Sequence, residues 1–172
     1  MSRNIILTGF MGTGKSTIGQ RLAAELGREF VDMDSFIEVR EGRPIRQIFT
    51  ESGEAYFRQL EAHLCRELAE QDDLVIATGG GALVAEANLK VMEQSGLVIC
   101  LDCDPAVLWQ RIGQSEDRPM LAVQDEGRFA RLAALLEQRN PAYDRIRRHL
   151  DVTYRSPDEA AKRISEWANG EW

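Results

Sequence analysis

The sequence has few cysteines, and they do not suggest a disulfide framework. Only Cys65, Cys100 and Cys103 occur among 172 residues. An odd number of thiols cannot pair evenly, and disulfide-dense scaffolds are typical of small secreted domains. We therefore expect a reducing compartment.

Cys100 and Cys103 form a CxxC, a spacing found in zinc sites and in redox pairs. Zinc would need two further soft ligands, and the two histidines of the chain, His63 and His149, lie far apart in sequence. A redox pair would be expected to open a helix directly. We therefore interpret the two cysteines as residues that a strand carries into the core.

Long apolar runs and net positive charge are also scarce. No run approaches the length of a membrane span, and residues 5–11 are too short and too broken by glycine for a signal peptide. The net charge of −7 argues against a surface that binds nucleic acid or anionic lipid. We expect a cytoplasmic protein with no membrane or nucleic-acid partner, in which an anionic ligand meets a local cluster of positive charge.

The sequence does contain a series of short, continuous apolar runs. Residues 5–8, 74–78 and 97–101 are rich in Val, Ile or Leu, a pattern typical of parallel strands covered on both faces. Residues 29–32 and 150–154 are weaker candidates. Because helical patterns separate the five runs, the sequence predicts a doubly wound α/β fold.

The length suits one domain, residues 1–172, that buries roughly 70% of the surface of the unfolded chain. Gly27 and a capping box at residues 156–159 mark a helix end and a helix start. Residues 33–72 break the simple alternation and form a helical insertion suited to a second substrate. Residues 113–125 have few apolar side chains and are predicted to form an exposed, mobile lid.

The strongest motif is at residues 9–16, which read GFMGTGKS and match GxxxxGKS/T between a predicted strand and a predicted helix. Its glycines let successive backbone N–H groups point at phosphate oxygens, and the helix adds the positive end of its dipole. Lys15 supplies a charge between the β- and γ-phosphates, and the Ser16 hydroxyl is placed to ligate Mg²⁺. The alternative, a glycine-rich structural turn, does not explain this context.

Two acids are candidates for the metal and the acceptor. Many proteins with this loop hold the metal with an acid after a third apolar strand, but residues 74–78 run into Gly79 instead. Asp32 and Asp34 follow the second strand candidate, and an extended chain would point both carboxylates toward the crevice. One can then face the metal and the other the acceptor, although acids are also common in loops and at helix caps.

Three consecutive glycines, residues 79–81, follow a predicted strand. They lose conformational entropy on folding and contribute no side-chain contact, so a ligand pressed against the backbone explains them better than packing does. Arg58 lies on a helix of the insertion, and Arg139 ends a later helix. Either arginine, considered singly, could be ordinary surface charge.

Taken together, these motifs resemble those of shikimate kinase. The order and spacing of that family are matched by the GFMGTGKS loop, Asp32-x-Asp34, Phe57-Arg58, the triple glycine, Arg118-Pro119 and Arg139-x-Pro141-x-Tyr143. The resemblance covers about residues 5–157. Met120-Leu121 stands where the family often has two leucines, which puts nothing catalytic in doubt.

The resemblance implies transfer of the γ-phosphoryl group of ATP to a hydroxyl of shikimate, giving shikimate 3-phosphate in chorismate and aromatic amino-acid biosynthesis. It also implies a sheet of strand order 2-3-1-4-5. The acceptor would be held by Asp34 through its hydroxyls, by Arg58 and Arg139 through its carboxylate, and by backbone at residues 79–81. Paired guanidinium groups suit a carboxylate.

The resemblance further implies that Arg118 reaches the phosphates from the lid and that Asp32 reaches Mg²⁺ through water. Lys15, Asp34 and Arg118 are the predicted catalytic residues, and Ser16 and Asp32 the predicted metal-binding residues. The predicted nucleotide-binding residues are Gly12, Thr13, Gly14, Lys15, Ser16, Thr17, Arg111, Arg118 and Arg155, and those for the acceptor are Asp34, Arg58, Gly79, Gly80, Gly81 and Arg139.

Two alternatives remain at this point. A related kinase acting on gluconate or a nucleoside monophosphate would have a similar phosphate site, although Arg58, Arg139 and the triple glycine favour a polyol that carries a carboxylate. A nucleotide-dependent switch would bind ATP without a small acceptor. We expect a monomer whose partners are shikimate and ATP.

Overall fold

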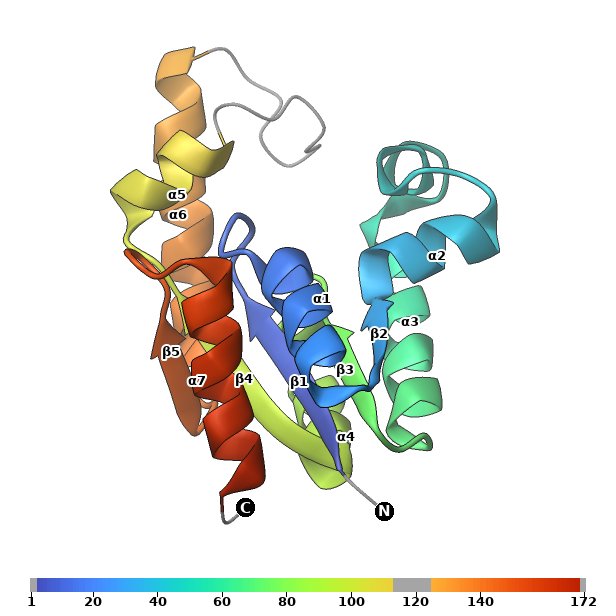
Figure 1. Cartoon of the computed structure of the whole chain (residues 1–172). Helices are drawn as coiled ribbons and strands as arrows, with labels where there is room; N and C mark the ends of the chain where they lie inside the picture. The colour runs from blue at the N-terminus through green and yellow to red at the C-terminus, as the bar shows by residue number, and fades with distance from the viewer. Residues whose placement is uncertain (1–2, 113–124, 171–172) are drawn as a thin grey trace.

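A five-stranded parallel sheet runs through the middle of the molecule, with helices on both faces (Figure 1). The computed structural model describes residues 3–112 and 125–170. The strands are β1 (Asn4–Gly9), β2 (Glu29–Asp32), β3 (Leu74–Ala77), β4 (Gly96–Asp102) and β5 (Arg148–Asp151). Their order is β2-β3-β1-β4-β5, and each neighbouring pair is parallel. The predicted fold class and strand order are confirmed.

The helices follow the predicted alternation. They are α1 (Lys15–Leu26), α2 (Met33–Glu41), α3 (Ile45–Ala69), a short 3₁₀ helix η1 (Ala82–Val84), α4 (Glu86–Ser95), α5 (Pro105–Ile112), α6 (Asp125–Tyr143) and α7 (Pro157–Asn169). Gly27 ends α1 in the left-handed conformation with φ 65°, and Ser156 and Glu159 form the expected capping box of α7. Among the described residues, no helix has the length and apolar character needed to cross a membrane.

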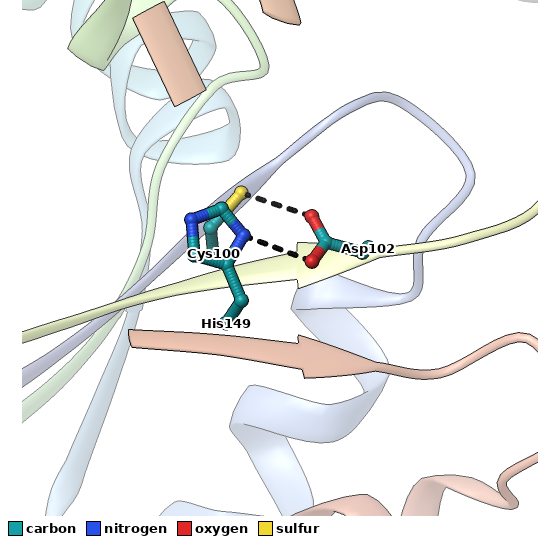
Figure 2. Close-up of side chains that lie close together, drawn as sticks. All are labelled: Cys100, Asp102 and His149. Atoms are coloured by element: carbon teal, nitrogen blue, oxygen red, sulfur yellow. Dashed lines mark hydrogen bonds and ion pairs between the residues drawn. The ribbon is translucent and has the colours of Figure 1, made fainter. Parts of the chain in front are cut away.

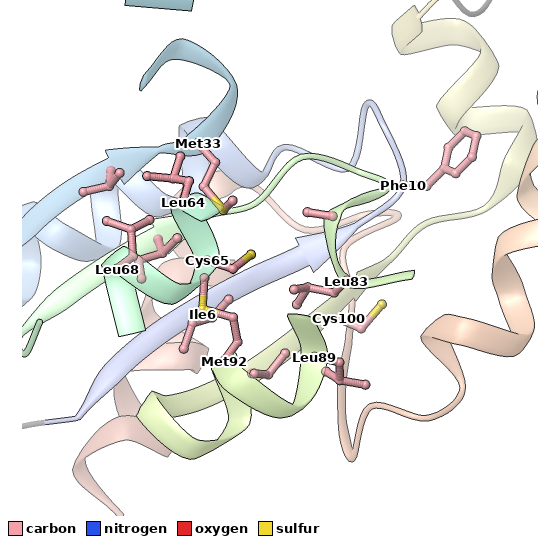
Figure 3. Close-up of a cluster of buried hydrophobic side chains, with 14 of the residues drawn as sticks. Ile6, Phe10, Met33, Leu64, Cys65, Leu68, Leu83, Leu89, Met92 and Cys100 are labelled. Carbon is pink, nitrogen blue, oxygen red and sulfur yellow. The ribbon is translucent and has the colours of Figure 1, made fainter. Parts of the chain in front are cut away.

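The continuous apolar strands are explained by burial on both faces of the sheet. Ile5 and Leu7 of β1 point to one face, where they pack with residues of α1 and α7. Ile6 points to the other face and packs with α3 and α4. Figure 3 shows part of this second cluster, in which Cys65 of α3 and Met92 of α4 lie near Ile6.

The predicted boundaries of the last strand were wrong. We expected residues 150–154, but β5 begins at Arg148 and ends at Asp151. β5 is an edge strand that pairs with β4 alone, so it accepts charged residues at its ends. The strand stops because the Asp151 carboxylate accepts hydrogen bonds from the backbone N–H of Thr153 at 2.9 Å and from its hydroxyl at 2.6 Å, which turns the chain.

The helical insertion contains a joint. α3 is interrupted at Gly53, whose φ of 85° and ψ of 165° are not helical, so it consists of two helices.

The strand order places β1 between β3 and β4. In open α/β sheets ligands bind outside the carboxyl ends of the strands where the order reverses. Gly9 ends β1 at this point, and the triple glycine follows β3 at the same edge.

Candidate active site

The loop between β1 and α1 has a backbone that glycine makes possible. Gly9, Gly12 and Gly14 have φ values of 132°, 82° and 90°. A Cβ added at Gly9 would also lie 2.5 Å from the backbone oxygen of Leu101. The first turn of α1 contains no acidic residue, so the positive end of its dipole is available to an anion.

Lys15 lies across this loop. Its Nζ donates hydrogen bonds to the carbonyl oxygens of Gly9 at 2.8 Å and Phe10 at 2.9 Å, which holds the ammonium group at the loop. Thr13 is buried, and its hydroxyl donates to the Phe10 carbonyl at 2.8 Å. The Thr13 side chain therefore supports the loop, and only its backbone is placed to contact a phosphate.

Asp32 connects the phosphate loop to α2. One carboxylate oxygen accepts a hydrogen bond from the Ser16 hydroxyl, and the other accepts from the backbone N–H of Ser35 at 3.1 Å and caps α2. A hydroxyl and a carboxylate held against each other are oxygen ligands of the kind that Mg²⁺ prefers, so the pair fits this ion.

The reason that we gave for the direction of Asp34 was wrong. The chain is not extended between the two acids, because Asp32 ends β2 and Asp34 lies in the first turn of α2. Both side chains nevertheless line the same cavity.

This cavity has a volume of about 770 Å³ and extends from the phosphate loop to the insertion. The predicted site residues that line it are Gly12, Gly14, Lys15, Ser16, Thr17, Asp32, Asp34, Arg58, Gly79, Gly80, Gly81 and Arg139. Part of its apolar wall comes from Ile45, Phe49 and Phe57 of α3. The structure thus brings together the predicted phosphate, metal and acceptor residues from five separate parts of the chain.

The two arginines predicted to flank adenine are not among the residues that line the cavity. Arg111 of α5 donates to the Gly12 carbonyl and to the carbonyls of Val152 and Thr153, each at 3.3 Å. Arg155 donates through Nε to the Asp151 carbonyl at 3.0 Å. Both arginines therefore lie at the loop that follows β5. Arg118 and residues 113–124 of the predicted lid lie outside the described residues.

The three glycines after β3 each lie against a different charged group. A Cβ at Gly79 would be 2.8 Å from Asp34 Oδ1, and a Cβ at Gly80 would be 3.1 Å from Arg139 Nη1. A Cβ at Gly81 would be 2.6 Å from Arg58 Nη1. None of the three has a left-handed φ. A side chain at any of these positions would displace the end of a charged side chain, so the glycines allow these charged groups to approach the backbone closely.

Glu61 belongs to this site, although we did not predict it. It is 1% exposed, and its Oε2 accepts a hydrogen bond from Arg58 at 2.5 Å. Its Oε1 has no hydrogen-bond partner among the described residues and would be 2.7 Å from a Cβ at Gly79. Burial raises the Glu61 pKa to about 6 despite the opposing charge and hydrogen bond of Arg58, and the charge of Asp34 makes a smaller contribution in the same direction as burial. The i,i+3 spacing from Arg58 was the available signal.

Tyr143 has a role that its place in a motif did not reveal. Its hydroxyl donates a hydrogen bond of 2.5 Å to the Gly80 carbonyl and so fixes the peptide that joins Gly80 to Gly81. Burial raises the Tyr143 pKa to about 12, so this group stays a donor at neutral pH. Arg139, one turn earlier on α6, is 6% exposed and lies over the Phe10 ring, 5.5 Å from its centroid.

A phosphate-binding loop at the switch point of a parallel sheet, facing a cavity lined by acids and arginines, defines a P-loop kinase that acts on a small molecule. The model of the shikimate kinase family matches residues 11–169. The chain belongs to the shikimate kinase family. This membership decides against the alternative of a nucleotide-dependent switch.

Individual relatives agree with the family assignment. The shikimate kinase of Desulforudis audaxviator (strain MP104C) is 49% identical over 142 residues, which are 83% of this chain and 74% of that protein. That of Pelotomaculum thermopropionicum is 40% identical over 162 residues, covering 94% and 93% of the two chains. The solved shikimate kinase from Acinetobacter baumannii in complex with shikimate superposes with a TM-score of 0.89 at 36% identity, covering 96% of this chain and 92% of that one.

Proposed function

We propose that the protein transfers the γ-phosphoryl group of ATP to a hydroxyl of shikimate and gives shikimate 3-phosphate, a step in the biosynthesis of chorismate. The observation that carries this proposal is the triple glycine, on which Asp34, Arg139 and Arg58 converge. A small ligand beside these three glycines meets two guanidinium groups, a carboxylate and the glycine backbone. Those groups match an acceptor that has one carboxylate and several hydroxyls.

In this proposal Arg58 and Arg139 bind the carboxylate of the acceptor, and backbone at residues 79–81 contacts its ring. Arg58 is held by Glu61 at 2.5 Å and by Glu54 at 3.2 Å, so its guanidinium group is positioned before the acceptor arrives. Such preorganisation reduces the entropy lost on binding. The acceptor is thereby oriented with a hydroxyl toward the phosphate loop.

The transfer itself depends mainly on positioning and electrostatics. Asp34 orients the acceptor hydroxyl and accepts its proton. Lys15 and the amides of the loop stabilise the negative charge that develops on the transferring phosphoryl group. Ser16 and Asp32 would hold Mg²⁺, which when bound neutralises charge on the β- and γ-phosphates. Arg118, the lid at residues 113–125, the monomeric state and the cytoplasmic location remain predictions.

The nucleotide is proposed to lie with its phosphates on the loop and its adenine near Arg111 and Arg155. Arg111 supports this placement because it already bridges the Gly12 carbonyl and the turn after β5. A planar guanidinium group can stack on an adenine ring. This arrangement leaves the cavity of the insertion for the acceptor.

An assay of ADP release, with and without shikimate, tests the proposed function. We expect shikimate to stimulate ADP release strongly and the product to carry one phosphate ester. Gluconate and nucleoside monophosphates serve as control acceptors and should not stimulate release. Equal rates of ADP release with and without shikimate would contradict the proposal.

A further inference from the structure

The pairing of β4 with β5 brings three metal-ligating side chains together outside the active site. In the register, Cys100 lies opposite His149, and Asp102 lies opposite Asp151. Cys100 and Asp102 are two residues apart on β4 and therefore point to the same face. Figure 2 shows the Cys100, Asp102 and His149 side chains directed toward one another from these two strands. His149 therefore lies near Cys100 in space although it is far from it along the chain, and the sequence distance does not exclude a zinc site.

The distances in this cluster are close to those of a coordination sphere. The His149 Nδ1 lies 2.8 Å from Asp102 Oδ2, and the Cys100 Sγ lies 3.6 Å from Asp102 Oδ1. The three potential ligand atoms lie within 4.8 Å of one another. In a tetrahedral zinc site with bonds of 2.0–2.3 Å, neighbouring ligand atoms are roughly 3.3–3.7 Å apart. Shifts of about 1 Å would therefore form the site.

The surroundings of His149 favour a metal ligand. Its Nε2 lies 3.0 Å from the carbonyl oxygen of Ile146. Zinc-binding histidines usually donate their second ring N–H to a carbonyl or carboxylate, which sets the ring orientation and leaves the other nitrogen for the ion. Here the nitrogen left for the ion is Nδ1, the atom that faces Asp102.

The three residues of the cluster differ in their exposure to solvent. Cys100 is fully buried, whereas the side chains of His149 and Asp102 are 32% and 48% exposed. An ion can therefore enter from solvent past Asp102, and a water molecule can supply the fourth ligand. Cys103 is not among the three clustered residues, so the CxxC does not act as a pair.

We propose that Cys100, Asp102 and His149 bind one zinc ion, which joins the edge strand β5 to β4. Coordination releases the thiol proton of Cys100, and any proton on His149 Nδ1, to solvent, and the thiolate and the carboxylate balance the charge of the ion. Thiolate sulfur and imidazole nitrogen are ligands that suit zinc, whereas Mg²⁺ prefers oxygen ligands. The site therefore selects zinc over Mg²⁺, the ion expected at Ser16 and Asp32.

Binding of cobalt and zinc to the purified full-length, metal-free chain tests the proposal. The buffer contains millimolar Mg²⁺, so that the oxygen-ligand site at the phosphate loop is occupied. Cobalt(II) should bind once per chain and give a thiolate-to-cobalt charge-transfer absorption, and zinc should displace it. Zinc at about a hundred times its Kd should raise the Tm by roughly 5–10 °C.

Variants separate this cluster from the other candidate ligands of the chain. Cys100→Ala should remove the charge-transfer absorption, and His149→Gln and Asp102→Asn should each weaken zinc binding at least about tenfold. The matched controls Cys103→Ala, His63→Gln and Asp32→Asn should keep it. The kinase rate of the zinc-free protein, measured with Mg²⁺ present, should be equal in wild type and His149→Gln, because the cluster lies outside the cavity.

Three results would overturn the proposal. One is the absence of a thiolate-to-cobalt absorption in the wild-type chain. Another is a thiolate-to-cobalt absorption that remains in Cys100→Ala. If that variant does not fold, the corresponding result is an unchanged zinc affinity in both His149→Gln and Asp102→Asn. The third is a zinc-induced rise in Tm that disappears in Asp32→Asn. The cluster would then be a hydrogen-bonded contact between two strands.

Discussion

Arg58 lies directly against Gly81: a Cβ added to Gly81 would be 2.6 Å from one terminal nitrogen of the guanidinium group and 2.7 Å from the other. The same two nitrogens form ion pairs with Glu61 and Glu54. The backbone and the two acids therefore leave the guanidinium group little freedom, and its position depends on the absence of one methyl group.

Gly81→Ala should displace the Arg58 guanidinium group and weaken acceptor binding. We expect kcat/KM for shikimate to fall by about 10- to 100-fold, equivalent to about 1.4–2.8 kcal/mol, while the affinity for ATP stays within about twofold. Steady-state kinetics and nucleotide titration measure the two quantities. Gly170→Ala is the control, since a Cβ there would be 3.5 Å or more from its neighbours. An unchanged KM for shikimate in Gly81→Ala would argue against a role of Arg58 in acceptor binding.

Removal of either arginine that is proposed to bind the carboxylate of shikimate should raise the KM of shikimate more than it changes kcat. Arg58→Ala and Arg139→Ala each remove a charge-assisted contact of about 1.5–3 kcal/mol. An analogue that lacks the carboxylate should lose much less, and Arg163→Ala, a surface residue paired with Glu166, should behave as wild type. Equal losses for shikimate and the analogue would contradict the carboxylate contact.

Lys15→Met should lower kcat by at least about 100-fold, because the ammonium charge acts on the transferring phosphoryl group. Met keeps most of the length and apolar character of the stem, so the Tm should change little. Kinetics and thermal unfolding are compared with those of Lys90→Met, which removes a surface lysine paired with Glu86. Near-normal turnover of Lys15→Met would exclude the proposed role of the loop.

Asp34→Asn should reduce kcat strongly and leave the affinity for ATP nearly unchanged. Asparagine keeps the size of the side chain and part of its hydrogen bonding, but an amide cannot accept the proton of the acceptor hydroxyl. Single-turnover rates and ATP titration distinguish the two effects, with Asp72→Asn, a loop position, as control. If Asp34→Asn instead lost ATP binding while the bound complex turned over at the normal rate, Asp34 would serve the metal and Asp32 the acceptor hydroxyl.

Glu61 should make the stability of the protein depend on pH. Its pKa is about 6 in the folded state and 4.5 in the unfolded reference, so the folded state binds the proton more tightly. The associated stabilisation is therefore fully present below pH 4.5 and is lost as the pH rises through 6. The shift corresponds to about 2 kcal/mol.

Denaturant unfolding at pH 4.5 and pH 7.5 tests this linkage. Between pH 7.5 and pH 4.5, the unfolding free energy of the wild type should rise by about 2 kcal/mol more than that of Glu61→Gln. Glu54→Gln, which alters the exposed partner of Arg58, should retain the wild-type difference. The same pH dependence in wild type and Glu61→Gln would show that Glu61 does not titrate in this range.

The sequence was sufficient for the parts of this protein that local patterns encode. The loop at residues 9–16 has its glycines where the backbone needs a positive φ, and β2 begins and ends where we predicted. β5 was misplaced because an edge strand carries a weaker apolar pattern and because the Asp151 side chain, which ends it, acts through a local turn.

The remaining site features depend on contacts between distant segments. No periodicity shows that Glu61 faces Asp34 across Gly79, since the two acids lie on different helices. Likewise, the contact of Cys100 with Asp102 and His149 arises from the register of two strands. Asp34 reaches the predicted cavity through helix geometry and not through an extended chain, because α2 begins directly after Asp32.

The joint at Gly53 has a consequence for how this family can diversify. Ile45 and Phe49, which form an apolar wall of the cavity, belong to the helix before the joint, whereas Arg58 and Glu61 belong to the helix after it. Because the backbone is not helical at Gly53, between the two helices, a mutation that tilts the first helix need not move the guanidinium group. An evolving lineage can therefore reshape the acceptor that it admits while it keeps the anchor for a carboxylate, and we expect new substrate preferences to arise by substitutions in residues 45–52.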